Sequence, residues 1–215
     1  LALGVDGINV DLEQVSSEAG EDYVEFLREL SISCRANNLV LSVDNYVPKN
    51  YNAHYDWKEQ GKVADYVIIM GYDEHYGGSQ EPGSVASIGY VEEGISTMVQ
   101  SVPSEKVINA VPFYTRIWET SGGEVKSQAV GMSAVQKFLS DRNIEAVWDE
   151  DTCQNYAEVQ DGDSFYQVWI EDARSLEVKM NIMKSYNIGG VAAWKLGYEK
   201  GHPEVWDVLS GFANG

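Results

Sequence analysis

Apolar residues recur along the chain in five short runs that are rich in β-branched side chains. The runs cover residues 4–12, 39–46, 65–72, 106–114 and 188–196. Stretches with apolar residues three or four positions apart separate most of them, which is the helical period. The first of these stretches carries Tyr23, Phe26, Leu27, Leu30 and Cys34. Further helices are expected over residues 88–102, 173–186 and 203–212. Strands that alternate with helices predict a parallel sheet, either doubly wound or closed as a (β/α)8 barrel.

The interval between Tyr114 and Ile188 is longer than a single helical crossover needs. Within it, residues 145–149, 155–160 and 165–170 alternate like short strands, and the Asp-Gly-Asp at 161–163 is typical of a turn. We therefore expect residues 118–170 to form a small antiparallel insertion inside one domain that covers residues 1–215.

The first apolar run contains the octapeptide Asp-Gly-Ile-Asn-Val-Asp-Leu-Glu, at residues 6–13. Strand alternation sends Ile8, Val10 and Leu12 to one face. It sends Asn9, Asp11 and Glu13 to the other. Two carboxylates and an amide stacked on one face repel and desolvate one another, a cost that folding alone does not explain. The alternative is a half-exposed antiparallel strand with a polar outer face.

This octapeptide resembles the Asp-x-x-Asp-x-Asp-x-Glu signature of glycoside hydrolase family 18. Three later segments are similar to the family in the same order. They are Val-Ile-Ile-Met-Gly-Tyr-Asp at 67–73, Val-Pro-Phe-Tyr-Thr-Arg at 111–116, and Gly-Gly-Val-Ala-Ala-Trp at 189–194. Residues 72–75, 85–87 and 169–174 look most like the bacterial branch that includes spore-cortex and cell-wall N-acetylglucosaminidases.

The resemblance implies an α/β fold, a (β/α)8 TIM barrel with a small antiparallel insertion before its last strand. Such a barrel usually needs about 250 residues. By family order, the five strands look like the fourth to the eighth, and the chain opens in mid-strand. We therefore expect residues 1–215 to be a fragment of a family 18 catalytic domain whose natural polypeptide extends upstream. Open barrel edges would favour self-association.

The resemblance also implies a mechanism and the residues that perform it. Family 18 enzymes use substrate-assisted catalysis, in which the acetamido group of N-acetylglucosamine attacks its own anomeric carbon. By position in the motifs, Glu13 would be the general acid and Asp11 would orient the acetamido group. Tyr72 would donate to the acetamido oxygen, Asp73 would bind the sugar or its polar surroundings, and Trp194 would form the floor of the site. Packing in the core is the alternative for Trp194 and Tyr72.

Position 9 departs from the family pattern, which has a third acid there. An amide cannot share a proton with Asp11, so the pH dependence is in question more than the activity. Met70 is expected beneath the sugar, Tyr114 and Arg116 along the subsites, and Trp118 stacked on a sugar ring.

The composition of the chain excludes several classes of binding partner and cofactor. A net charge of −19 and a pI near 4.3 disfavour nucleic acid and anionic membranes. No apolar run approaches the roughly 20 residues of a membrane helix, and the first residues lack the basic start and the small-residue cleavage site typical of a signal peptide. The three histidines have no metal-ligand spacing, so we expect neither a metal nor a cofactor. No strand precedes a Gly-x-Gly-x-x-Gly, which argues against a dinucleotide-binding domain.

The sequence therefore predicts a hydrolase of β-1,4 bonds beside N-acetylglucosamine, in peptidoglycan or chitin-like glycans. It would act outside the cell, at the cell wall or spore surface. The alternative is a non-catalytic glycan-binding domain on the same scaffold.

Overall fold

The computed structural model describes residues 4–213, which form two compact units. The first unit contains the described residues up to Met70, together with Glu93–Ala110 and Tyr186–Ala192. The second contains Gly71–Glu92, Val111–Ser185 and the described residues from Ala193 onward.

A five-stranded sheet carries the strands of the predicted β/α pattern. Its strands, in the order β1-β2-β3-β4-β10, are β1 Gly7–Val10, β2 Val40–Tyr46, β3 Tyr66–Met70, β4 Val107–Pro112 and β10 Gly190–Trp194. The pairs β1–β2, β2–β3 and β3–β4 are parallel. Each predicted strand run therefore contains one observed strand, and the parallel pairing is confirmed.

The first strand is shorter and less buried than its alternation predicts. It ends at Val10, so Leu12 lies outside the sheet and is 49% exposed. Ile8, which the alternation assigns to the core, is 37% exposed. The reason is position, because β1 is the edge strand and has a neighbour only in β2.

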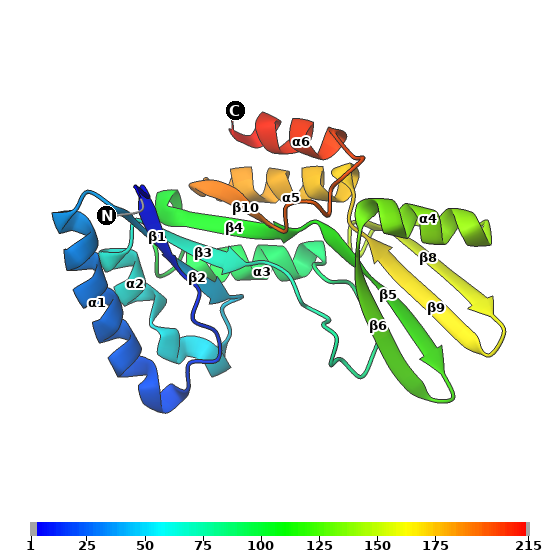
Figure 1. Cartoon of the computed structure of the whole chain (residues 1–215), viewed down its shortest axis with the longest axis horizontal. Coiled ribbons are helices and arrows are strands. Elements are labelled where there is room, and N and C mark those ends of the chain that lie inside the picture. Colours follow the sequence, from blue (N-terminus) through cyan, green and yellow to red (C-terminus); the bar gives the residue numbers. More distant parts are fainter. Residues whose placement is uncertain (1–3, 214–215) are drawn as a thin grey trace. The chain divides into compact units, whose positions relative to one another are not determined.

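Two helices pack on this sheet in the first unit. Helix α1 (Gly20–Ala36) follows the 3-10 turn η1 (Ser17–Ala19) and packs on β2. Helix α2 (Trp57–Val63) follows η2 (Asn50–Tyr55) and packs on α1 and β3 (Figure 1). The buried side of α1 includes Tyr23, Leu27 and Cys34, as predicted, whereas Phe26 is 43% exposed. The remaining elements near the sheet are α3 (Ile88–Met98) and η3 (Ser104–Lys106).

The second sheet is antiparallel, with the order β6-β5-β9-β8-β7. Its strands are β5 Tyr114–Ser121, β6 Glu124–Gly131, β7 Val147–Asp149, β8 Gln154–Asp161 and β9 Ser164–Ile170. The last three confirm the short strands expected from the sequence. The β5–β6 hairpin was not predicted, although Gly122 and Gly123 supply the two positive φ angles that a tight hairpin turn requires.

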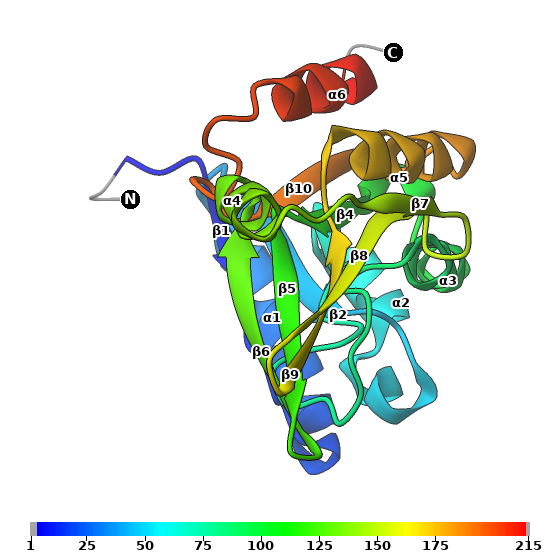
Figure 2. The ribbon, with the colours of Figure 1, turned by 90° about the vertical axis from the view of Figure 1, so that its right-hand side faces the viewer.

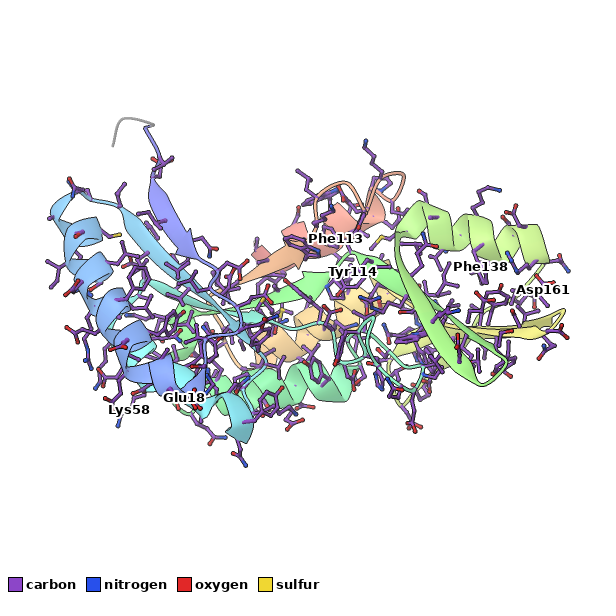
Figure 3. All side chains as sticks on the ribbon, turned by 60° about the horizontal axis from the view of Figure 1, so that its bottom comes forward. Glu18, Lys58, Phe113, Tyr114, Phe138 and Asp161 are labelled. Atoms are coloured by element: carbon purple, nitrogen blue, oxygen red, sulfur yellow. The ribbon has the colours of Figure 1, made fainter. Side chains whose placement is uncertain are left out.

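Helix α4 (Met132–Arg142) covers one face of the antiparallel sheet (Figure 2). Its Val135 and Leu139 form a core with Ala157, Val168 and Ile170 of the strands. Phe138 projects from α4 (Figure 3), and its ring meets that of Tyr166 edge-on at 5.6 Å.

Helices α5 (Ala173–Ser185) and α6 (Glu204–Ala213) pack on each other in the second unit. Among the residues that the structure describes, no helix is long and apolar enough to span a membrane.

Candidate active site

β1 and β2 are neighbours in the sheet, and their polar side chains lie on the same face of it. In the parallel register, Asn9 sits beside Ser42. The Asn9 amide nitrogen donates to Ser42 Oγ at 3.0 Å and to Asp44 Oδ1 at 3.1 Å. Burial along β2 alternates, with Val43 and Asn45 buried and Ser42, Asp44 and Tyr46 half-buried. The polar rows of the two strands therefore share one face of the sheet.

Glu13 lies in the turn that follows β1, and its carboxylate accepts a hydrogen bond from Tyr46. The Tyr46 hydroxyl is 2.8 Å from Glu13 Oε2. Burial and this hydrogen bond raise the pKa of Tyr46, so the phenol stays a donor.

The segment that carries Glu13 is held by side chains from η2. The Val15 amide donates to the buried Tyr55 hydroxyl at 3.1 Å, and that hydroxyl lies 3.4 Å from the Leu12 carbonyl. His54 Nε2 lies 2.8 Å from the Val15 carbonyl oxygen. Tyr55 and His54 were not among the site residues predicted from the sequence, since no motif marks them and only the fold brings them to this segment.

Burial and like charge raise the proton affinity of two acids on this face, Asp11 and Asp44. Partial burial raises the pKa of Asp11, and repulsion from the Glu13 carboxylate adds to it. Burial also raises the pKa of Asp44. The hydrogen bond from Asn9 opposes that shift, and the charges of Asp11 and Glu13 reinforce it. No Lys, Arg or His within residues 4–213 forms an ion pair with any of the three acids.

A second group of predicted site residues comes together in the second unit. Tyr114 (labelled in Figure 3) is buried, and its hydroxyl donates to Asp73 Oδ1 at 2.7 Å. Burial and the Asp73 carboxylate raise the pKa of Tyr114. The Arg116 guanidinium lies 3.7 Å from the same Asp73 oxygen and donates to Ser127 Oγ at 3.1 Å. The Tyr72 ring meets the Tyr114 ring edge-on at 6.2 Å. Asp73 is thus held by a phenol and a cation.

The other predicted contact residues have different degrees of exposure. Trp194 ends β10 and is 51% exposed, while its carbonyl accepts from the Phe113 amide at 2.7 Å. Met70 is the last residue of β3 and is half-buried.

Trp118 is not the exposed sugar-stacking ring that we expected. It is 1% exposed, and its indole Nε1 donates to the Gly83 carbonyl at 2.9 Å. The residue belongs to the core because the chain around Gly83 packs over that part of β5.

The described part of the chain contains no group of three or more His, Cys, Asp or Glu side chains placed to hold a metal ion. His75 Nδ1 lies 2.8 Å from the Ser84 carbonyl, and His202 Nδ1 lies 2.9 Å from Glu204 Oε1.

Comparison with known proteins accounts for these motifs. The model of the family "Glycosyl hydrolases family 18" matches residues 2–199. The cortical fragment-lytic enzyme of Bacillus subtilis is 29% identical over 222 residues, which cover 96% of this chain and 49% of that protein. This chain therefore spans about half the length of that relative.

Two solved structures share the fold. The spore cortex-lytic enzyme SleL of Bacillus cereus superposes with a TM-score of 0.87 at 29% identity, over 97% of this chain and 49% of that one. A chitinase of Chromobacterium violaceum superposes with a TM-score of 0.88 at 26% identity, over 98% of this chain and 67% of that one. The resemblance carried by the four sequence segments is confirmed, and the chain belongs to glycosyl hydrolase family 18.

Proposed function

We propose that the complete protein is a glycoside hydrolase that cleaves β-1,4 bonds beside N-acetylglucosamine in peptidoglycan or chitin-like glycans. The observation that carries the proposal is the group of acids on β2 and in the segment after β1, which forms no ion pair among the described residues. There Glu13 accepts a hydrogen bond from Tyr46, and Asp11 has a raised pKa. Membership of the family supports it. So do the names of the relatives, a cortical fragment-lytic enzyme and a chitinase.

The proposed reaction is substrate-assisted and retains the anomeric configuration. Glu13 gives its proton to the leaving glycosidic oxygen while the substrate's acetamido oxygen attacks the anomeric carbon and forms an oxazolinium ion. Asp11 orients the acetamido N–H and stabilises the positive charge that develops. Water then attacks the anomeric carbon and loses a proton to the Glu13 carboxylate, which restores both the acetamido group and the acid.

The second group of residues would bind the sugar. Tyr72 would donate its hydroxyl to the acetamido oxygen, Asp73 would accept from the sugar, and Trp194 would supply a flat apolar surface. Tyr114 and Arg116 would act by holding Asp73, because both already contact its carboxylate. We assign Met70 a packing contact and Asn9 a place on the polar face.

We further propose that the five strands of the first sheet are the fourth to eighth of a (β/α)8 barrel. Residues 1–215 would then be part of its catalytic domain, and residues 118–170 its insertion. The exposed Ile8 and Val40 on the edge strand and its neighbour support this, since further barrel units would cover them. The same edge would let isolated copies of this chain associate.

The proposed location is outside the cell, at the cell wall or spore surface. The relatives' names support that location. The net charge of −19 is compatible with a glycan ligand and unfavourable for nucleic acid.

The test is to incubate the complete protein with peptidoglycan and with chitin oligomers and to measure product masses and anomeric configuration. Products with new N-acetylglucosamine reducing ends in the β configuration are expected from one of the two glycans. Glu13→Gln is the matched control, because it keeps the shape of the side chain and removes the acid. Binding of either glycan without cleavage would instead indicate a glycan-binding domain.

A further inference from the structure

Asn9 joins the polar row of β1 to a carboxylate on the neighbouring strand. Its amide nitrogen has two hydrogens, and the partners of that nitrogen are Ser42 Oγ and Asp44 Oδ1. The amide itself can neither take nor release a proton near neutral pH. Any additional titration on this face must therefore come from another side chain.

Asp44 is that side chain. It occupies the polar face of β2 between Ser42 and Tyr46, and Tyr46 in turn donates to Glu13. Asn9 of β1, together with Asp11 and Glu13 of the segment after it, thus runs beside Ser42, Asp44 and Tyr46 of β2. Asp44 contacts the first of these two groups through Asn9 and is half-buried, so solvent screens its charge only in part.

The groups around Asp44 bring no positive charge. Asp11 and Glu13 come from the segment after β1, and Tyr46 lies on β2 itself. Helix α1 brings the phenol of Tyr23, whose ring contacts that of Tyr55, and β3 places Ile68 beside Asp44. Burial raises the pKa of Tyr23, and the charges of Asp44 and Asp11 contribute. Asp44 therefore acts on the neighbouring acids by repulsion, and no Lys, Arg or His among the described residues forms an ion pair with it.

We propose that Asp44 is a third acid of this site, which sets through its charge the pH range in which Asp11 and Glu13 work. The proposal rests on the proposed function and deepens it. Asp44 does not touch the reacting atoms in this scheme, so it is a tuning residue. Its like charge makes ionisation of the neighbouring acid Asp11 less favourable, and Asp11 and Asp44 titrate as a coupled pair.

A purely structural role makes a different prediction. If Asp44 only anchors Asn9, then Asp44→Asn should change little, because the carboxamide oxygen accepts the same hydrogen bond. The substitution keeps the shape and the acceptor and removes only the charge. The position of the pH–rate profile therefore separates the two roles.

The experiment measures kcat and KM against pH for the complete protein and its variants. Asp44→Asn is expected to move the profile to lower pH by roughly 0.5–1 unit, with KM changed less than about twofold. Glu29→Gln removes the same charge from an exposed position on α1 and should leave the profile in place. Asn9→Asp combined with Asp44→Asn returns a carboxyl to the face and should bring the profile back toward the wild type.

Superimposable profiles for Asp44→Asn and the wild type would overturn the proposal. So would a uniform fall in kcat without displacement along the pH axis, which would show that the substitution disturbs the site without acting through charge.

A second readout separates this proposal from the proposed function. Carboxyl carbon NMR follows the titration of Asp11 in the complete protein without any substrate. The Asp11 midpoint is expected to fall in Asp44→Asn, whether or not the protein cleaves glycans. A shifted midpoint in an inactive protein would reject only the proposed function, whereas an unshifted midpoint in an active protein would reject the role of Asp44.

Discussion

The two compact units hold carboxylates in opposite ways. In the second unit, Glu171 and Lys179 are 0% and 1% exposed, and their charged atoms lie 2.7 Å apart. Ser175 donates to the other Glu171 oxygen at 3.1 Å, and the Gln154 amide also donates to Glu171. In the first unit, Asp44 and Glu13 accept hydrogen bonds from the neutral donors of Asn9 and Tyr46.

The difference separates a structural acid from reactive ones. A buried charge is tolerated when a cation and hydrogen bonds satisfy it, and such a pair has little freedom to exchange a proton. Acids that lack a cation and repel one another bind protons more tightly, which suits proton transfer. Burial is the main cause of the raised pKa values of Asp11 and Asp44, and repulsion between the acids adds to it.

The comparison is tested most strongly at Glu13. Glu13→Gln in the complete protein should lower kcat by about 10²–10⁴, because general acid catalysis contributes that much. The midpoint of thermal unfolding should stay unchanged, since the exposed amide can still accept from Tyr46. Turnover near the wild-type value would remove Glu13 from the mechanism.

Lys179→Met should have the opposite effect to Glu13→Gln, because it should lower the stability of the fold and not the rate of the reaction. It leaves Glu171 buried without a cation, so the free energy of unfolding should fall by about 3–5 kcal/mol in urea titrations. The matched control is Glu171→Gln combined with Lys179→Met, which removes both charges and should recover most of the loss. If Lys179→Met is as stable as the wild type, the ion pair with Lys179 is not what makes the burial of Glu171 tolerable.

Tyr46→Phe tests whether the neutral donor matters to the acid that it holds. Loss of one hydrogen bond to a carboxylate should lower kcat about tenfold. Stability should change little because water reaches the exposed Glu13. Unchanged turnover would mean that Glu13 is positioned without Tyr46.

The smallest effect is expected for stability against pH in Asp44→Asn. The pKa of Asp44 lies above the ordinary Asp value of 3.8, so the folded state binds the proton more tightly than the unfolded state. Its stabilising contribution is present below pH 3.8 and is lost as the pH rises through the folded pKa. Asp44→Asn should therefore melt about 1–2 °C higher than the wild type at neutral pH, and the difference should vanish below pH 3.8. A variant that is less stable at neutral pH would contradict the raised pKa.

Local pattern was enough to predict the parallel strands and most helices. The spacing of apolar residues indicates which face of a strand or helix packs against the rest of the protein. The four motif segments were enough to identify the family. The octapeptide also singled out Asp11 and Glu13, because their types and spacing are local properties of the chain. The roles assigned to them remain predictions.

Only the tertiary structure decided which side chains meet those acids. Asp44 reaches Asn9 through the register of β1 on β2, and Tyr46 and Tyr55 hold the segment of Glu13 from far along the chain. Burial was decided in the same way, since Trp118 is covered by the chain near Gly83 while Leu12 and Phe26 stay exposed. Contacts between distant segments depend on strand order and covering elements, and a single sequence does not record these.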